Sequence, residues 1–130
     1  VPLPRYTTVG GIPITQLMSE DRIEAISART AGGGGEIVKL LERGSAFYAP
    51  GSAAAIMAEA VLNDRRRVIP ASCYLTGQYG LEDVYIGVPC ILGANGVETI
   101  FELDLSDAEL ESLQGSANFY KGQLKDILGY

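Results

Sequence analysis

The chain has 130 residues, of which 47% are hydrophobic and 20% are charged, and its net charge is −6. This balance is typical of a folded globular domain, and the acidity excludes a nucleic-acid-binding domain, which needs a basic face. The apolar runs are too short to cross a bilayer. The sequence begins at Val1 without a methionine, as a fragment or a processed product would.

The first third of the chain is expected to contain two short strands and a long helical tract. β-Prone residues flank Gly10-Gly11 within residues 3–14, which favours two strands joined at the glycines. A helical tract follows, with an N-cap at Ser19 and apolar residues at helical spacing as far as Leu41. The run 32–35 inside this tract is all glycine, and each interior glycine costs about 1 kcal/mol relative to alanine. We therefore expect a break, a kink, or a face that another backbone approaches closely.

The middle of the chain changes from helical spacing to alternation. A second helix is expected over residues 52–63, and alternating segments then predict three strands, at residues 68–75, 81–92 and 97–103. Asn95-Gly96 separates the last two strands, and this dipeptide is a strong hairpin signal because both residues tolerate positive φ. The expected sheet is an antiparallel three-stranded meander.

A final helix is marked at its start. Ser106 and Glu109 have the spacing of a capping box, and Leu105 with Leu110 forms a hydrophobic staple. The predicted fold class is therefore α+β, with an antiparallel meander and long packed helices in one domain over residues 1–130.

The residues present do not form a self-contained active site. The absence of histidine from the sequence removes histidine-dependent nucleophile systems, histidine general bases and most zinc sites, and no dinucleotide-binding or P-loop glycine motif occurs. We predict no metal site and no catalytic residue. Each acidic pair has a structural interpretation, as a first helical turn, a loop and a capping box, for Glu20-Asp21, Glu82-Asp83 and Asp107/Glu109 respectively.

The cysteines and the basic run also have structural interpretations. Cys73 and Cys90 each lie in a strand-like run, which favours two buried, reduced thiols in a cytosolic protein over a disulfide. The run 65–67 is all arginine and follows the second helix, where it complements the negative end of the helix dipole.

Several motifs, in order along nearly the whole chain, resemble the C-terminal domain of the lactate/malate dehydrogenase superfamily. The first is similar to the segment that follows that family's G-G-H-G-D motif, and the next resemble its substrate-pocket helix and its late hairpin. They are Val1-Pro2-Leu3-Pro4-Arg5 with Gly11-Ile12-Pro13; Gly33 to Leu41 with Gly44-Ser45-Ala46-Phe47-Tyr48-Ala49-Pro50; and Gln78-Tyr79-Gly80, Gly87-Val88-Pro89 and Leu92 to Glu98.

The resemblance implies the substrate-side half of an NAD-dependent enzyme whose Rossmann half, with the catalytic histidine, its aspartate and the carboxylate-binding arginines, lies upstream of Val1. It implies hydride transfer between NAD and a small 2-hydroxy acid, and a cytoplasmic homo-oligomer. The pattern is closest to the lactate-dehydrogenase-like malate dehydrogenases, which are commonly tetramers. The fragment alone is expected to be inactive.

The resemblance also assigns roles to three positions. Ala46 matches a pocket residue that is threonine in the lactate enzymes and small in the malate enzymes, and with Ser45 it forms the predicted substrate-binding position. Pro50 matches an apolar residue beside the nicotinamide ring. Because alanine leaves room for a four-carbon dicarboxylate, malate and oxaloacetate are favoured. The alternatives are that Ala46 is only a small residue where helices approach, that the enzyme uses lactate or another 2-hydroxy acid, or that the chain is a self-associating, non-catalytic module.

Overall fold

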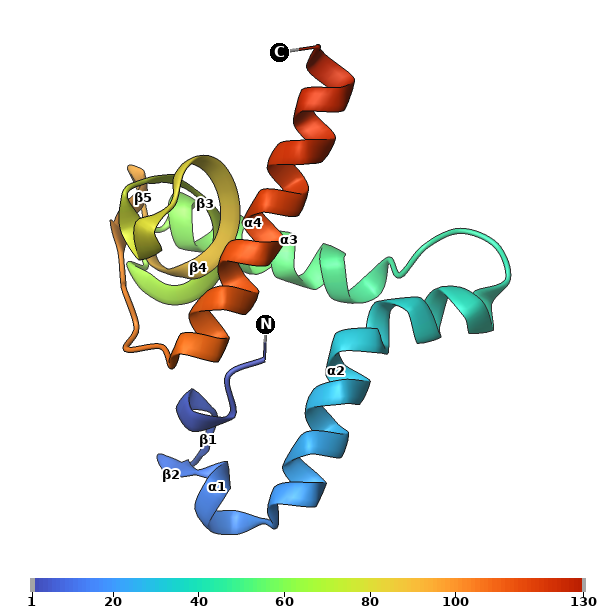
Figure 1. The fold of residues 1–130 in the computed structure, drawn as a ribbon. Helices are drawn as coiled ribbons and strands as arrows, with labels where there is room; N and C mark the ends of the chain where they lie inside the picture. Colours follow the sequence, from blue (N-terminus) through green and yellow to red (C-terminus); the bar gives the residue numbers. More distant parts are fainter. Residues whose placement is uncertain (1, 130) are drawn as a thin grey trace. The chain divides into compact units, whose positions relative to one another are not determined.

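The computed structural model describes residues 2–129 and divides the chain into two compact units, one ending at Pro50 and the other beginning at Gly51. The first unit contains a 3-10 turn η1, a small hairpin and two helices: η1 (Pro4–Tyr6), β1 (Thr8–Val9), β2 (Ile12–Pro13), α1 (Ile14–Leu17) and α2 (Glu20–Leu41). Helix α3 (Tyr48–Leu62) runs through the boundary. The second unit continues with β3 (Arg67–Thr76), a 3-10 turn η2 (Gln78–Gly80), β4 (Glu82–Gly93), β5 (Gly96–Ile100) and α4 (Asp107–Leu128). Figure 1 labels its strands and helices along the ribbon.

The predicted strand pair at the start of the chain is confirmed, although it is shorter than expected. Strands β1 and β2 are antiparallel, and the two glycines between them have φ of 58° and 85° for Gly10 and Gly11. The segment before β1 is not extended. Pro4 instead begins the 3-10 turn, because its fixed φ suits the first position of a helical turn, and Tyr6 N–H donates to the Leu3 carbonyl at 3.1 Å.

The expected break at the glycine run did not occur, because α2 is one continuous helix from Glu20 to Leu41. Figure 1 shows that the ribbon changes direction along α2, so of the three expected outcomes the bend is the one observed. The Thr30 hydroxyl donates to the Ile26 carbonyl at 2.7 Å, a side-chain bond of the kind that bends helices. No described atom outside the helix's own local backbone lies within 4 Å of a β-carbon built on any of the four glycines, so no other backbone approaches this face in residues 2–129.

The first unit has very little core of its own. Among its described residues only Ile14 and Ile23 are buried. The other apolar residues of the predicted α2 stripe face solvent: Ile26, Ile37 and Leu41 are each about two-fifths to one-half exposed. The stripe is therefore amphipathic, as predicted, but most of its apolar face has no cover.

The three-stranded antiparallel meander is confirmed, in the order β3-β4-β5. Alternation places one set of side chains on an inner face, where Leu75 and Cys90 are fully buried and Val84 is 2% exposed. Helix α4 contacts β4 and adds Leu113 and Ala117 to this core. The helix begins as predicted: Ser106 and Glu109 form a capping box in which each side chain bonds the other residue's backbone N–H. The apolar side chains of α4 are buried mainly in its first half, since Tyr120 and Leu124 are about half exposed.

The β4–β5 hairpin differs in detail from the predicted turn. Gly93 pairs with Gly96, so the loop consists of Ala94 and Asn95, and only Gly96 of the predicted dipeptide has positive φ, at 83°. Asp64 closes the loop, since its carboxylate accepts the Ala94 N–H at 2.9 Å.

Gly93 is fixed by close packing at this hairpin. A β-carbon at that position would lie 2.6 Å from Glu98 Oε1 and 2.9 Å from Asp64 Oδ1. Glu98 in turn forms a 2.9 Å salt bridge with Arg66.

Other boundary predictions need correction. Helix α3 begins at Tyr48 rather than at residue 52, and β5 ends at Ile100 rather than at residue 103. Glu82 and Asp83 belong to β4, not to a loop, and Asp83 has φ of 53° beside a register shift in the ladder.

The cysteines are free and buried, as predicted. Burial and the neighbouring Cys90 thiol raise the pKa of Cys73 to about 11. Of the arginine run after α3, Arg65 bonds Glu59 at 3.1 Å and Arg66 bonds Glu98. These arginines therefore act through specific ion pairs, in addition to any effect of the helix dipole.

Candidate functional site

The predicted site residues lie in and just after the connection between α2 and α3. Helix α2 ends at Leu41, and Glu42 leaves it with φ of 59° while its N–H donates to the Val38 carbonyl at 3.2 Å. Gly44, with φ of 90°, then turns the chain toward α3. This turn presents residues 45–47 as an irregular segment before the helix starts.

The three predicted residues differ in their surroundings. Ser45 is exposed, Ala46 is half-buried, and Pro50 is exposed in the first turn of α3. Proline is tolerated there because the first-turn N–H groups have no partner within the helix. The structure thus places all three on one short segment, and it leaves their roles as predictions.

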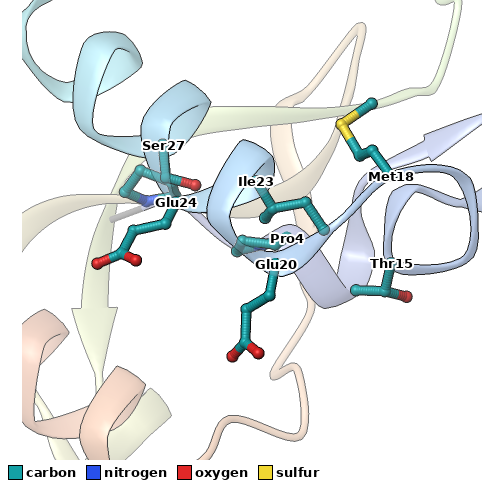
Figure 2. Close-up of a pocket in the computed structure, with 8 residues that line it drawn as sticks. Pro4, Thr15, Met18, Glu20, Ile23, Glu24 and Ser27 are labelled. Atoms are coloured by element: carbon teal, nitrogen blue, oxygen red, sulfur yellow. The ribbon is translucent and has the colours of Figure 1, made fainter.

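One hollow of the first unit contains none of these residues. It is an open cavity of about 670 Å³ between the N-terminal segment, α1 and the first turns of α2. Figure 2 shows that the side chains of Glu20 and Glu24, one helical turn apart, lie on the same side of the helix. The lining is Pro2, Pro4, Thr15, Met18, Glu20, Ile23, Glu24 and Ser27.

A second hollow, of about 470 Å³, runs along α2 beside the glycine run, between Ile26 and Leu40. Its one cation is Arg29, whose guanidinium bonds both carboxylate oxygens of Glu36, at 3.3 and 3.1 Å. This hydrogen bonding, together with the charge of Arg29, holds the pKa of Glu36 below its usual range. The Arg29–Glu36 ion pair thus links residues that lie before and after the glycine run.

Neither hollow suits an organic dianion. The first has two carboxylates and no basic residue in its lining, so it repels a dicarboxylate. In the second, Nε and Nη2 of Arg29 already donate to Glu36, whose negative charge offsets that of the guanidinium. A dicarboxylate bound near Ala46 would therefore need cationic partners other than those that line these hollows.

The described residues 2–129 contain no group of three or more His, Cys, Asp or Glu side chains able to hold a metal ion. Within the same range no helix combines the length and the apolar character needed to cross a membrane.

Sequence reasoning missed the hydrogen-bond network around the buried Tyr79. Tyr79 has φ of 56° and is 8% exposed, and its hydroxyl donates to the Phe101 carbonyl at 2.7 Å and accepts the Leu103 N–H at 2.9 Å. Its own N–H donates to the Glu102 carboxylate at 2.7 Å. The flanking Gly77 and Gly80 indicated only a turn, because the partners are more than twenty residues away.

These observations define a class: an α+β domain with a small-residue loop, and with neither a metal cluster in its described part nor a nucleotide-binding motif in its sequence. The chain belongs to the lactate/malate dehydrogenase family, since residues 2–129 match the family model described as "lactate/malate dehydrogenase, alpha/beta C-terminal domain". The predicted resemblance and fold class are thereby confirmed.

Malate dehydrogenases are among the similar curated proteins. The one from Thermomicrobium roseum is 63% identical over 118 residues, covering 91% of this chain and 38% of the relative. The one from Salinibacter ruber is 54% identical over 127 residues, covering 98% of this chain and 40% of the relative. The chain thus spans about two-fifths of the length of these relatives.

Solved structures give the same result. The malate dehydrogenase of Salinibacter ruber superposes with a TM-score of 0.94 at 54% identity, over 98% of this chain and 42% of that one. A lactate dehydrogenase from Eimeria maxima, solved with NADH and oxamate, superposes with a TM-score of 0.92 at 46% identity, over 98% and 41% of the two chains.

Proposed function

We propose that this chain is the substrate-side domain of an NAD-dependent malate dehydrogenase that interconverts malate and oxaloacetate. The observation that carries this proposal is the identity of 54–63% with malate dehydrogenases across at least nine-tenths of the chain. The half-buried Ala46 adds support, because its methyl side chain leaves room for the second carboxylate of a C4 substrate.

In this proposal the chain forms part of the wall of the substrate pocket and does not supply the group that transfers the proton. Ser45 and Ala46 border the substrate, and the exposed Pro50 ring offers an apolar surface that suits one face of a nicotinamide ring. When bound, the cofactor supplies the hydride acceptor or donor. The sequence has no histidine, so in this proposal the histidine that transfers the proton in the family pattern is not supplied by these residues.

Assembly is also part of the proposal. Three large side chains are mostly exposed, Tyr48 at 95%, Leu62 at 83% and Leu40 at 76%, and burying their apolar area in an assembly would be favourable. We propose that the intact enzyme covers these residues, as a homo-oligomer and most simply a tetramer, and that it is cytoplasmic, consistent with two free cysteines. Light scattering that finds the purified chain strictly monomeric at micromolar concentration would count against self-association.

A chimera tests the activity. We expect this chain, substituted for the matching two-fifths of the Salinibacter ruber enzyme, to give a folded protein that oxidises NADH with oxaloacetate and turns over pyruvate far more slowly. The isolated chain should be inactive with both substrates. A chimera with native circular dichroism and native size but no preference for oxaloacetate would contradict the proposal.

Ala46→Thr in the same chimera tests the proposed pocket. Threonine adds two heavy atoms where the second carboxylate would fit, and over-packing costs about 1–3 kcal/mol, which is roughly a 5- to 150-fold loss of kcat/KM for oxaloacetate. The loss for pyruvate should be smaller. Ser106→Ala is the control, because it removes a helix cap and should leave the substrate ratio unchanged. Equal losses for both substrates would make Ala46 a packing residue.

The second candidate is a lactate dehydrogenase, favoured by the 46% identity with the Eimeria maxima enzyme. Faster turnover of pyruvate than of oxaloacetate by the chimera would select it.

A further inference from the structure

The residues on either side of Ser45 and Ala46 lie close together, because the Phe47 ring packs against Gly44. A β-carbon built on Gly44 would lie 2.9 Å from Cζ and 3.0 Å from Cε2 of the Phe47 ring. Carbon atoms in contact normally stay about 3.5–4.0 Å apart. The ring therefore occupies the space that any side chain at position 44 would need.

Glycine is required at position 44 for a second, separate reason. Its φ of 90° lies in a region that residues with a side chain rarely adopt. Gly11 has a nearly equal φ of 85°, but nothing would lie within 4 Å of a β-carbon at that position. The two glycines thus share backbone strain and differ in the aromatic contact, so Gly11 is a matched reference for Gly44.

Phe47 is not a core residue. Its side chain is 63% exposed and belongs to no buried cluster of the described residues. Its contact with Gly44 bridges only residues 45 and 46. The contact therefore contributes little to the core, and its main consequence is to restrict the backbone of the two residues that it encloses.

We propose that the contact between Gly44 and Phe47, here called the clasp, holds Ser45 and Ala46 in position at the substrate. Gly44 and Phe47 are then positioning residues for substrate selection. This inference rests on the proposed function of the Ser45–Ala46 segment. The clasp acts at the end of the substrate that distinguishes oxaloacetate from pyruvate. Loosening it should therefore weaken binding of the dicarboxylate more than it slows the chemical step.

A double-mutant cycle in the chimera tests the clasp. We expect Gly44→Ala to push the ring away and to lower kcat/KM for oxaloacetate about tenfold, mainly through KM, with Phe47→Ala giving a smaller loss of the same kind. The double variant should lose several-fold less than the product of the single losses, because without the ring the new methyl group has nothing to displace. Phe47→Tyr, which keeps the ring, should stay within about twofold of the parent. Gly11→Ala should lower stability and leave kcat/KM within about twofold.

A second measurement does not depend on activity. Trypsin cleaves after Arg43, directly before the clasp, so opening it should speed cleavage at this bond about fivefold or more in the Phe47→Ala variant, and not in Phe47→Tyr or Gly11→Ala. An inactive chimera that still shows this pattern would overturn the proposed function and keep the clasp. Unchanged cleavage in Phe47→Ala, or fully multiplicative losses in the cycle, would overturn the clasp itself.

Discussion

Replacing Tyr79 by phenylalanine tests how much the hydrogen bonds of its hydroxyl, which link the β3–β4 turn to the segment after β5, contribute to stability. The hydroxyl donates to the Phe101 carbonyl at 2.7 Å and accepts the Leu103 N–H at 2.9 Å. The substitution keeps the ring, which is 8% exposed, and removes only the oxygen. Any change in stability therefore reports these two hydrogen bonds.

The magnitude follows from the surroundings of the two backbone groups. A buried polar group left without a partner costs about 1–3 kcal/mol. Phe101 is 36% exposed, so water can replace part of what its carbonyl loses, and Leu103 is half-buried. We expect Tyr79→Phe to lower the free energy of unfolding by about 1–2 kcal/mol, which corresponds to a Tm decrease of roughly 4–8 °C in a domain of this size.

Urea denaturation followed by circular dichroism measures the change. Tyr74→Phe is a matched control, because the Tyr74 hydroxyl also makes a short hydrogen bond, 2.6 Å to Asp83, but on an exposed surface. That bond raises the pKa of Tyr74 and is worth little when water can replace it. We expect a loss below about 0.5 kcal/mol for the control. Equal losses for the two variants would refute the argument that burial of the Tyr79 network matters.

Two further predictions concern the same unit. Gly93→Ala should lower the free energy of unfolding by about 1–3 kcal/mol in urea titrations, because the methyl group would lie 2.6 Å from Glu98 Oε1. An unchanged urea midpoint of unfolding would mean that the hairpin relaxes freely. The pKa of Cys73 is raised from 9.0 to about 11, so the native state favours the neutral thiol: this contribution to stability is complete below pH 9 and is lost as pH rises through 11. Native protein at pH 8 should accordingly react slowly with a thiol reagent at Cys73, and slowly at Cys90 because that thiol is buried. Both should react quickly in urea, and fast labelling of the native state would contradict this.

The sequence predicted those features that depend on neighbours along the chain. The strand alternation from residue 68 onward, the glycine pair before β2 and the Ser106–Glu109 capping box each act within a few residues, and each is present. Of the three outcomes expected at the glycine run, the bend is observed and the break is not, because glycine keeps its backbone N–H. Unlike proline, it weakens the helical ladder without interrupting it.

Long-range features could not be predicted in this way. Tyr79 forms hydrogen bonds with groups 22 to 35 residues away. The need for glycine at position 44 depends in part on where the Phe47 ring lies. For the site, residue types located Ser45, Ala46 and Pro50 only through a family resemblance. The one cation that lines either of the hollows described above, Arg29, is already paired with Glu36.

The small core of the first unit has a consequence for the order of folding. Only two of its described side chains are buried, and four consecutive glycines lie in its long helix, so this helix gains little free energy from its own contacts. The second unit has a continuous core and a well-capped helix. Its strands pair with their neighbours in the chain, so forming the sheet requires closing only short loops. Amide hydrogens of α2 should therefore exchange with solvent long before those of β3 and β4, and α2 should gain protection when the surface that covers its apolar face is present.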